Sequence, residues 1–245
     1  MLKSRLKDQY METLLRGSRK DSRAIVLGEL RRGANAEKLY MDLMWPAMET
    51  VERMYREDRI NSATEHMATR INRFLVDQVQ RDLEESAPNG KRIVITCADG
   101  EREELGAQMC SDLFEAQGWD VYFIGGGVPN DEILALVGQV RPDILMVYGM
   151  TPQGVPGVRA LIDQVREVGV NPTMNVLVAG GVFNRAADLW KEINADLFAE
   201  NALDSLQVAV NAEPRVPEVR IPGAPKKRRR RRRPPLLMEA EAQTR

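Results

Sequence analysis

The spacing of apolar residues changes once along this chain, near Pro88, and this change constrains the fold more than any other feature. Before residue 86, apolar side chains recur every three or four positions, which is the spacing of amphipathic helices. After Lys91, short apolar runs alternate with amphipathic segments, and about 120 residues hold five such units. Parallel strands need crossover connections, so this alternation predicts a doubly wound parallel sheet. We therefore expect an α/β protein, with a helical module at residues 1–86 and a sheet module at 91–212.

Four helices account for the first module, and their short connections favour an antiparallel four-helix bundle. A glycine marks the expected end of each of the first two helices. The third helix spans about residues 36–55, and Pro46 is expected to kink it because proline has no backbone N–H. The fourth begins at Ser62, which forms a predicted capping box with Glu65.

The second module is expected to have the flavodoxin-like strand order 2-1-3-4-5. Its five strands are predicted at the apolar runs 93–96, 121–124, 144–147, 176–179 and 197–199. In this order, the ligand crevice lies at the carboxyl ends of the first, third and fourth strands. The corresponding loops span residues 98–106, 149–154 and 180–184.

Composition excludes several classes of protein. A chain of 245 residues that is 43% hydrophobic can bury sizeable cores. No stretch approaches the roughly 18 consecutive apolar residues of a spanning helix, and the first residues lack a signal-peptide pattern, so we expect a cytoplasmic protein without membrane contact. Two cysteines do not make a disulfide framework or a structural zinc site. One histidine without an evident nucleophile partner predicts no independent catalysis.

Charge is distributed unevenly between the body of the chain and its end. Residues 213–245 carry 11 Lys and Arg against 4 Asp and Glu, whereas the first 212 residues carry 24 against 32. Prolines followed by eight consecutive cations, Lys226 to Arg233, predict a disordered basic tail. Such a run can hold nucleic acid through phosphates, without reading its sequence. No helix-turn-helix module is expected before the first helix.

Glycine-containing motifs recur at the predicted strand ends. Residues 100–106 read Gly-Glu-Arg-Glu-Glu-Leu-Gly, and Gly180-Gly181 follows the fourth strand. In this order, and after a helical bundle, they resemble the cobalamin-binding domain family with a helical-bundle cap. The amino-acid sequence of the first loop is most similar to that of light-responsive adenosylcobalamin repressors. The glycine pair is also needed for tight strand-to-loop geometry in any fold of this class, and the triple glycine at 125–127 is assigned to a turn.

The resemblance implies a ligand site between the cap and the sheet loops. In the family, an aromatic residue and a Glu-His pair mark the lid over the corrin, and here they fall on Tyr55, Glu65 and His66. The expected cofactor-binding residues are Tyr55, Arg56, Glu65, His66, Glu101, Glu103, Thr151, Gly180 and Gly181. Glu65 is equally explained by the capping box. No catalytic residue and no metal ligand is expected.

The chain departs from this family at the positions that would ligate cobalt. The family's first-loop histidine is Glu103 here, and a carboxylate suits cobalt less well than imidazole. The repressors' second cobalt-binding histidine, beside a lid tryptophan, is Arg56 beside Tyr55. Light-triggered ligation by two histidines is therefore excluded in its known form. The expected cofactor is cobalamin without histidine ligation, or another tetrapyrrole such as a bilin, whose propionates would contact Arg56 or Arg70.

Three functions are compatible with these features. The main hypothesis is a tetrapyrrole-binding sensor or regulator, light-responsive in one version, that acts through ligand-dependent changes in a homo-oligomer or in contacts with a regulatory partner. The first alternative is an interaction module that keeps the fold without a cofactor. The second is a corrinoid methyl carrier serving methyltransferases, which the missing first-loop histidine disfavours because such carriers use that ligand while cobalt changes oxidation state.

Overall fold

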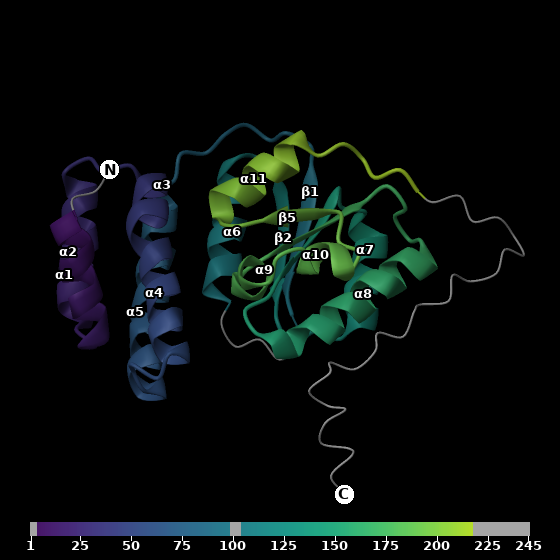
Figure 1. The fold of residues 1–245 in the computed structure, drawn as a ribbon. Helices are drawn as coiled ribbons and strands as arrows, with labels where there is room; N and C mark the ends of the chain where they lie inside the picture. The colour runs from purple at the N-terminus through teal and green to yellow at the C-terminus, as the bar shows by residue number, and fades with distance from the viewer. Residues whose placement is uncertain (1–3, 99–103, 218–245) are drawn as a thin grey trace, which may run out of the picture.

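The computed structural model describes residues 4–98 and 104–217 (Figure 1). It confirms the predicted architecture, an N-terminal helical bundle followed by a parallel five-stranded sheet with helices on both faces. We call residues 4–82 the cap and residues 92–215 the sheet domain. No helix in the described part of the chain is both long and apolar enough to cross a membrane.

The cap is built from helices joined by short turns. Its elements are α1 (Ser4–Leu15), α2 (Arg19–Arg31), α3 (Ala36–Leu39), the π-helix η1 (Tyr40–Met44), α4 (Trp45–Arg56), α5 (Ser62–Val79) and the 3-10 turn η2 (Gln80–Asp82). The kink expected at Pro46 takes the form of the π-turn directly before it. Asn72 Nδ2 of α5 donates to the carbonyl oxygen of Met44 at 3.1 Å, and the Tyr10 hydroxyl of α1 donates to Asn72 Oδ1 at 2.8 Å. A buried polar pair therefore links α1 and α5 to the backbone at the end of the π-turn.

The start of α5 differs from the predicted capping box. Asn61, not Ser62, is the N-cap, and its Oδ1 accepts the Thr64 N–H at 2.9 Å. Glu65 instead accepts from the Thr69 hydroxyl at 3.2 Å. Asn caps a helix as well as Ser does, and the shift by one residue puts Thr64 at the third helical position. The capping-box prediction was therefore wrong, because the reciprocal carboxylate contact needs glutamate at that position.

The sheet domain follows the predicted alternation of strands and helices. Its elements are β1 (Arg92–Cys97), α6 (Leu105–Ala116), β2 (Asp120–Gly125), α7 (Asn130–Val140), β3 (Ile144–Tyr148), η3 (Pro152–Gly154), α8 (Val155–Val168), β4 (Asn175–Ala179), α9 (Gly181–Arg185), α10 (Leu189–Glu192), β5 (Leu197–Ala199) and α11 (Ala202–Asn211). The order β2-β1-β3-β4-β5, parallel throughout, is the predicted topology. Gly125 and Gly127 have φ values of 67° and 75°, as the predicted turn after β2 requires.

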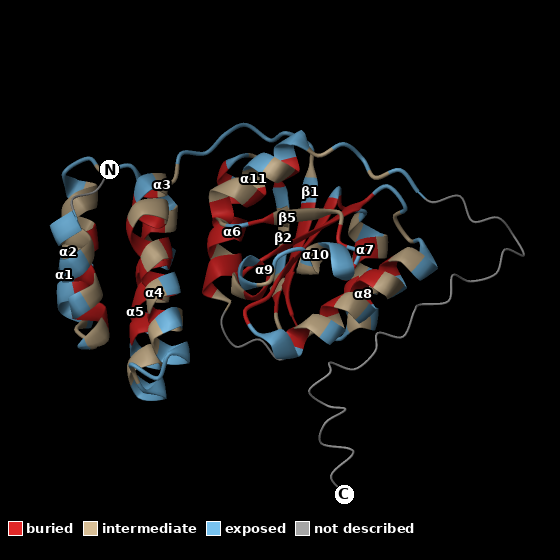
Figure 2. Ribbon diagram, viewed as in Figure 1, coloured by how far each residue is buried: buried red, intermediate tan, exposed pale blue. Residues whose placement is uncertain are grey.

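Two apolar cores lie on the two faces of the sheet (Figure 2). Helices α7 and α8 cover one face, and α6 and α11 cover the other. The core under α6 continues into the cap, so the two modules share one set of buried side chains. Every residue of β3 and β4 is buried, which explains why these strands are continuous apolar runs in the sequence rather than alternating ones.

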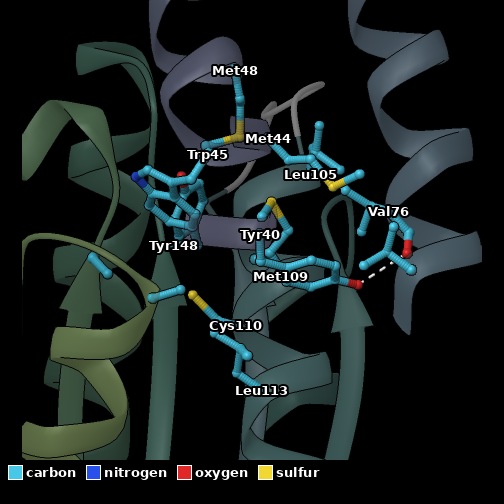
Figure 3. Packing of buried hydrophobic residues seen from close by; sticks show 14 of the residues in the cluster. Tyr40, Met44, Trp45, Met48, Val76, Leu105, Met109, Cys110, Leu113 and Tyr148 are labelled. Atoms are coloured by element: carbon cyan, nitrogen blue, oxygen red, sulfur yellow. Dashed lines mark hydrogen bonds between the residues drawn. The ribbon is translucent and has the colours of Figure 1, made fainter. Parts of the chain in front are cut away.

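Large side chains dock the cap on α6 (Figure 3). Tyr40 and Met44 of the π-turn are fully buried, as are Leu105 and Met109 of α6. In Figure 1, α4 and α5 stand next to α6, while α1 and α2 lie on the far side of the cap. Full burial of a side chain of this size contributes about 1.5–3 kcal/mol, so this contact is a main source of stability for the two-module arrangement.

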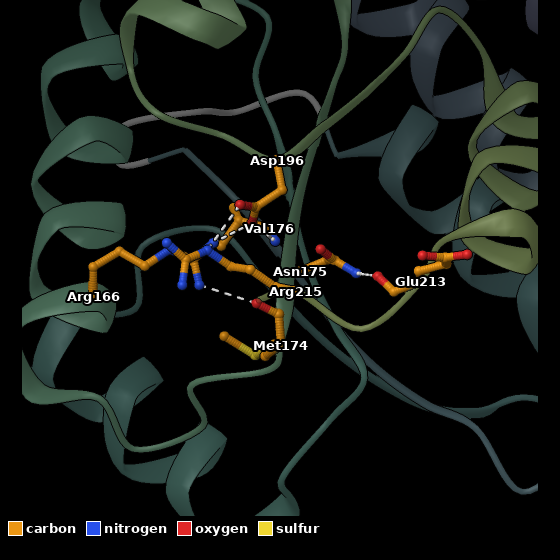
Figure 4. Close-up of polar contacts among 7 residues, drawn as sticks. All are labelled: Arg166, Met174, Asn175, Val176, Asp196, Glu213 and Arg215. Atoms are coloured by element: carbon orange, nitrogen blue, oxygen red, sulfur yellow. Dashed lines mark hydrogen bonds and ion pairs between the residues drawn. The ribbon is translucent and has the colours of Figure 1, made fainter. Parts of the chain in front are cut away.

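The segment after α11 is anchored at the amino-terminal edge of the sheet (Figure 4). Asn175 Nδ2 donates to the Glu213 carbonyl oxygen, and the Arg215 N–H donates to the Thr173 carbonyl oxygen, each at 2.8 Å. Arg215 Nε also lies 3.1 Å from Asp196 Oδ1. We call residues 212–217 the strap. At 213–217 the structure thus differs from the expected tail, while residues 218–245, with the cationic run, lie outside the described residues.

Chains ending at residue 217 and at residue 212 are expected to differ in stability. The shorter chain loses the strap's backbone contacts and the Arg215–Asp196 ion pair, whose side chains are each 21% exposed. Hydrogen bonds contribute about 1 kcal/mol each and those to charged groups about 1.5–3 kcal/mol, so we expect a loss of about 3 kcal/mol in the free energy of unfolding measured in urea. Arg166 also pairs with Asp196 and remains in both chains. Equal stabilities would show that the strap is not docked.

Candidate functional site

A cleft of about 190 Å³ lies between α4 of the cap and the carboxyl edge of the sheet. Its walls come from α4, from the ends of β3 and β4 and from α9. The lining residues are Trp45, Met48, Glu49, Glu52, Arg53, Arg56, Tyr148, Met150, Gly180, Gly181, Asn184 and Arg185. The crevice position expected for a doubly wound sheet is therefore the place where the cap meets the sheet domain.

One face of α4 forms the cap side of the cleft. The lining positions 45, 48, 49, 52, 53 and 56 follow one another at helical spacing and so share one face. Trp45 and Met48, in the first turns, are each only 5% exposed, and Trp45 Nε1 donates to Glu49 Oε1 at 2.9 Å. Glu52 and Arg56 are more exposed and pair with each other at 3.2 Å. This wall is therefore apolar at one end and charged at the other.

Bare backbone forms the sheet side of the cleft at Gly180 and Gly181. Gly180 has φ 105° and ψ 167°, a conformation that essentially only glycine adopts. A Cβ there would lie 2.3 Å from the Gly149 carbonyl oxygen, which accepts the Val182 N–H at 3.3 Å. The glycine pair is thus required by the close approach of the loops after β3 and β4, and it also leaves a wall without side chains.

Tyr148, at the end of β3, fills the space between the cleft and α6. Its side chain is 2% exposed, and a Cβ on Gly106 would lie 2.0 Å from its hydroxyl oxygen. The last glycine of the first-loop motif is therefore explained by the packing of this tyrosine. Glu104, directly before α6, accepts the Gly126 N–H at 2.6 Å and lies 4.0 Å from Arg73 of α5. Its carboxylate joins the cap to the turn after β2.

One arginine connects the sheet edge to the cap across the cleft. Arg185, at the end of α9, lies 3.3 Å from Glu52 of α4 and also donates to the Met150 carbonyl oxygen. The Arg185 side chain is 32% exposed and that of Glu52 is 25% exposed, so the pair is partly shielded from water. We call this contact the Arg185 bridge, and it closes the cleft between α4 and the strand ends.

The structure brings three of the predicted site residues together. Arg56, Gly180 and Gly181 all line the cleft, the first from the cap and the other two from the sheet edge. Tyr55 is next to Arg56 in α4, but it is 46% exposed and does not line the cleft. Thr151 is exposed in the loop after β3 and does not line it either.

The remaining predicted residues lie elsewhere or outside the described residues. Glu65 and His66 are near the start of α5, where Glu65 Oε2 lies 3.4 Å from His66 Nε2, and neither lines the cleft. Glu101 and Glu103 belong to the segment 99–103, outside the described residues. His66 is the only histidine of the chain, so the cleft contains no imidazole. Within residues 4–98 and 104–217, no three His, Cys, Asp or Glu side chains gather as metal ligands do.

Sequence reasoning missed Trp45, Met48 and Arg185. Leu43 and Val51, which follow the apolar spacing of the predicted third helix, are buried. Trp45 and Met48 form a second apolar stripe on the same helix. This stripe was the signal in the sequence that could have identified them as lining residues. Arg185 had no signal in the sequence, because its position depends on how the short helix α9 leaves Gly180.

A helical cap docked at the carboxyl edge of a 2-1-3-4-5 parallel sheet, with a cleft at the contact, defines a two-module α/β protein with a candidate ligand site. Residues 91–207 match a family model described as a B12 binding domain, and residues 6–80 match a second model with the same description. The two matches follow the sheet domain and the cap, and together they span most of the chain. The protein belongs to the B12-binding domain family.

Curated relatives include dimethylamine corrinoid proteins of Methanosarcina species. Dimethylamine corrinoid protein 3 of Methanosarcina mazei is 26% identical over 118 residues, which are 48% of this chain and 69% of that protein. Dimethylamine corrinoid protein 1 of Methanosarcina acetivorans is also 26% identical over 118 residues and is covered to 54%. The similarity thus spans about half to two thirds of these relatives.

A solved structure shares the whole fold. The monomethylamine corrinoid protein of Methanosarcina barkeri superposes with a TM-score of 0.74, at 17% sequence identity, over 84% of this chain and 97% of that one. At this identity the likeness establishes the fold alone. It extends across both modules, so the arrangement of a bundle followed by a sheet domain is common to the two proteins.

Proposed function

We propose that the protein binds a corrinoid in the cleft and carries it for a partner protein. The observation that carries this proposal is the pairing of the apolar face at Trp45 with the bare backbone at Gly180–Gly181, two walls suited to a flat macrocycle. The relatives are corrinoid proteins, which favours the carrier alternative over the sensor hypothesis. The names of the relatives give a light-responsive role no support.

The cleft suits a corrinoid in chemistry, but it must widen to admit one. Trp45 and Met150 offer apolar surface, and the charged groups of Glu52 and Arg56 suit the amide groups around a corrin. The cleft has a volume of about 190 Å³, whereas pockets for drug-sized ligands have roughly 300–1,000 Å³. A corrinoid is larger than a drug-sized ligand. Binding therefore requires that the Arg185 bridge opens and that α4 moves away from the strand ends.

The residues of the chain would hold and shield the cofactor rather than carry out a reaction by themselves. When bound, a corrinoid supplies cobalt–carbon bond chemistry. Trp45 and Tyr148, both buried, exclude water from the inner end of the cleft. Glu52 and Arg185, released from each other, can hydrogen-bond to amide groups. Because the cleft holds no nucleophile–base pair, the loading and removal of a one-carbon group fall to partner enzymes.

A bound corrinoid is expected without imidazole from the protein, because the single histidine lies outside the cleft. Cob(II)inamide is the sharpest probe, since it has no base of its own and any nitrogen ligand must come from the protein. We expect it to stay with the protein through gel filtration and to give an EPR spectrum without axial nitrogen splitting. Glu103→His, at the position of the family's histidine, should introduce that splitting.

Each outcome of this experiment has a distinct meaning. Nitrogen splitting in the wild-type spectrum would contradict the ligation claim. Loss of cob(II)inamide during gel filtration would contradict corrinoid binding itself. If biliverdin stays with the protein while cob(II)inamide does not, the cleft serves another tetrapyrrole; if neither stays, the interaction-module hypothesis is favoured.

Two expected partners rest on the sequence alone. A homo-oligomer and an unspecific contact with nucleic acid through Lys226 to Arg233 stay predictions, and the cationic run lies outside the described residues. A phosphate contact of this kind is electrostatic, so its affinity should fall steeply between low and physiological salt.

A further inference from the structure

A buried carboxyl group and a buried phenol meet where the cap docks on the sheet domain. The Tyr40 hydroxyl of η1 lies 2.8 Å from Asp112 Oδ2 of α6 and 3.0 Å from the carbonyl oxygen of Val76 in α5. Tyr40 is fully buried and Asp112 is 7% exposed. Figure 3 shows the Tyr40 ring reaching across α6 to Val76. The contact therefore joins three helices, two from the cap and one from the sheet domain.

The number of protons at this contact decides which hydrogen bonds can exist. A phenol has one proton to donate, and both neighbouring oxygens of Tyr40 are acceptors when Asp112 is ionised. One of the two short contacts would then be a pair of buried oxygens without a proton between them. With a protonated Asp112, the carboxyl group donates to Tyr40 and Tyr40 donates to Val76, so both distances are those of hydrogen bonds.

The surroundings also favour the protonated form of Asp112. Burial raises the pKa of Asp112 from its ordinary value of 3.8 to about 6, against the lowering effect of a hydrogen bond from Tyr40, and the nearby carboxylates of Asp77 in α5 and Glu115 in α6 raise it further. Burial and Asp112 also raise the pKa of Tyr40, which keeps its proton. Cys110, buried on the same helix, has a raised pKa and is neutral. No salt bridge reaches Asp112 within the described residues.

We propose that Asp112 and Tyr40 form a proton-dependent lock between the cap and the sheet domain. In the locked state, Asp112 donates to Tyr40 and Tyr40 donates to the Val76 carbonyl oxygen. After loss of the Asp112 proton, the single phenol proton of Tyr40 turns to the carboxylate, so the hydrogen bond to Val76 is lost and a buried charge lies against η1 and α5, which weakens the docking of the cap. Because α4 belongs to the cap, the same proton controls how firmly the cleft is closed. The lock itself does not depend on which ligand the cleft binds.

The direction of the pH dependence follows from the raised pKa of Asp112. The folded protein holds this proton up to about pH 6, whereas the unfolded chain releases it near pH 3.8. The stabilisation is therefore fully present below about pH 4 and is lost as the pH rises through 6. The pKa of Asp112 thus differs by about two between the folded and the unfolded protein, which corresponds to a roughly 100-fold change in the folding equilibrium constant between these pH limits.

Unfolding in urea between pH 4 and pH 8 tests the lock in the full chain. Asp112→Asn keeps a donor for Tyr40 but has no proton to lose. We therefore expect the wild type to lose about 100-fold in the folding equilibrium constant as the pH rises, and Asp112→Asn to lack this loss. Glu84→Gln, which removes an exposed carboxylate in the connection between the cap and the sheet domain, is the matched control and should follow the wild type. Identical pH profiles for the wild type and Asp112→Asn would overturn the proposal.

A second measurement applies even if Asp112→Asn does not fold. Carbon-13 NMR of the aspartate side chains in the wild type, with Asp112 assigned through its own backbone, gives the titration of this carboxyl group directly. We expect a midpoint near pH 6 and slower hydrogen exchange of α5 amides below that pH, after correction for intrinsic rates. A titration midpoint of Asp112 near pH 4 would contradict the lock. Hydrogen exchange of the α5 amides that does not change as Asp112 titrates would also contradict it.

Discussion

Replacement of Gly180 with alanine is expected to lower the free energy of unfolding by about 3 kcal/mol or more. Two effects add: the backbone at φ 105° and ψ 167° is strained for any residue with a Cβ, at about 1–3 kcal/mol, and the new Cβ meets the Gly149 carbonyl oxygen at 2.3 Å. That oxygen belongs to backbone at the end of β3, so it cannot move aside as a flexible side chain would. Urea denaturation at fixed pH measures the loss.

Gly33→Ala is the matched control for this substitution. Gly33 also has a positive φ, 84°, but a Cβ there has nothing within 4 Å, so only the conformational cost of about 1–2 kcal/mol is expected. The difference between the two variants isolates the crowding at the sheet edge. If Gly180→Ala is no more destabilising than Gly33→Ala, the close approach of the loops after β3 and β4 is not as described.

The fold was largely predictable because its cause lies in local sequence. The change from helical spacing to alternating strand and helix units located both modules, and continuous apolar runs identified the fully buried strands β3 and β4. The details that escaped prediction depend on contacts between distant segments. The π-turn before Pro46 was not predicted, and the Met44 carbonyl oxygen at its end is bound by Asn72 from another helix. The strap was interpreted as tail because its docking relies on Asn175 and Asp196, far away in the chain.

The site was predictable at Arg56, through the family's lid pattern, and at the glycines that mark special backbone geometry. Gly180 and Gly181 were found through the sequence because glycine signals a special conformation and a close approach. Glu65 and His66 matched a family pattern, yet they lie outside the cleft, because they are on α5 whereas α4 forms the cap side of the cleft. Arg185 joins the site through contacts with Glu52, 133 positions away in the chain, and with the Met150 carbonyl oxygen, which no local pattern encodes.

Cobalamin binding is expected to be lost when the cleft is filled from the sheet side. Gly181→Leu places a side chain at the wall of a cleft of about 190 Å³, where the new Cβ would first meet Arg185 Nη1 at 2.6 Å and Met150 Cε at 3.3 Å. Both neighbours are ends of flexible side chains, so the fold should survive. A filled site costs about 3 kcal/mol of binding energy or more, which corresponds to a Kd raised about 100-fold or more.

Equilibrium titration of cobalamin, followed by absorption, into the wild type, Gly181→Leu and Gly138→Leu tests whether a corrinoid binds between α4 and the strand ends. Gly138, on the outer helix α7, is the matched control because a Cβ there has nothing within 4 Å. We expect one saturable site in the wild type, the same Kd for Gly138→Leu, and an affinity lower by about 100-fold or more for Gly181→Leu. Absence of cobalamin binding by the wild type, or equal affinities in all three proteins, would contradict a corrinoid site between α4 and the strand ends.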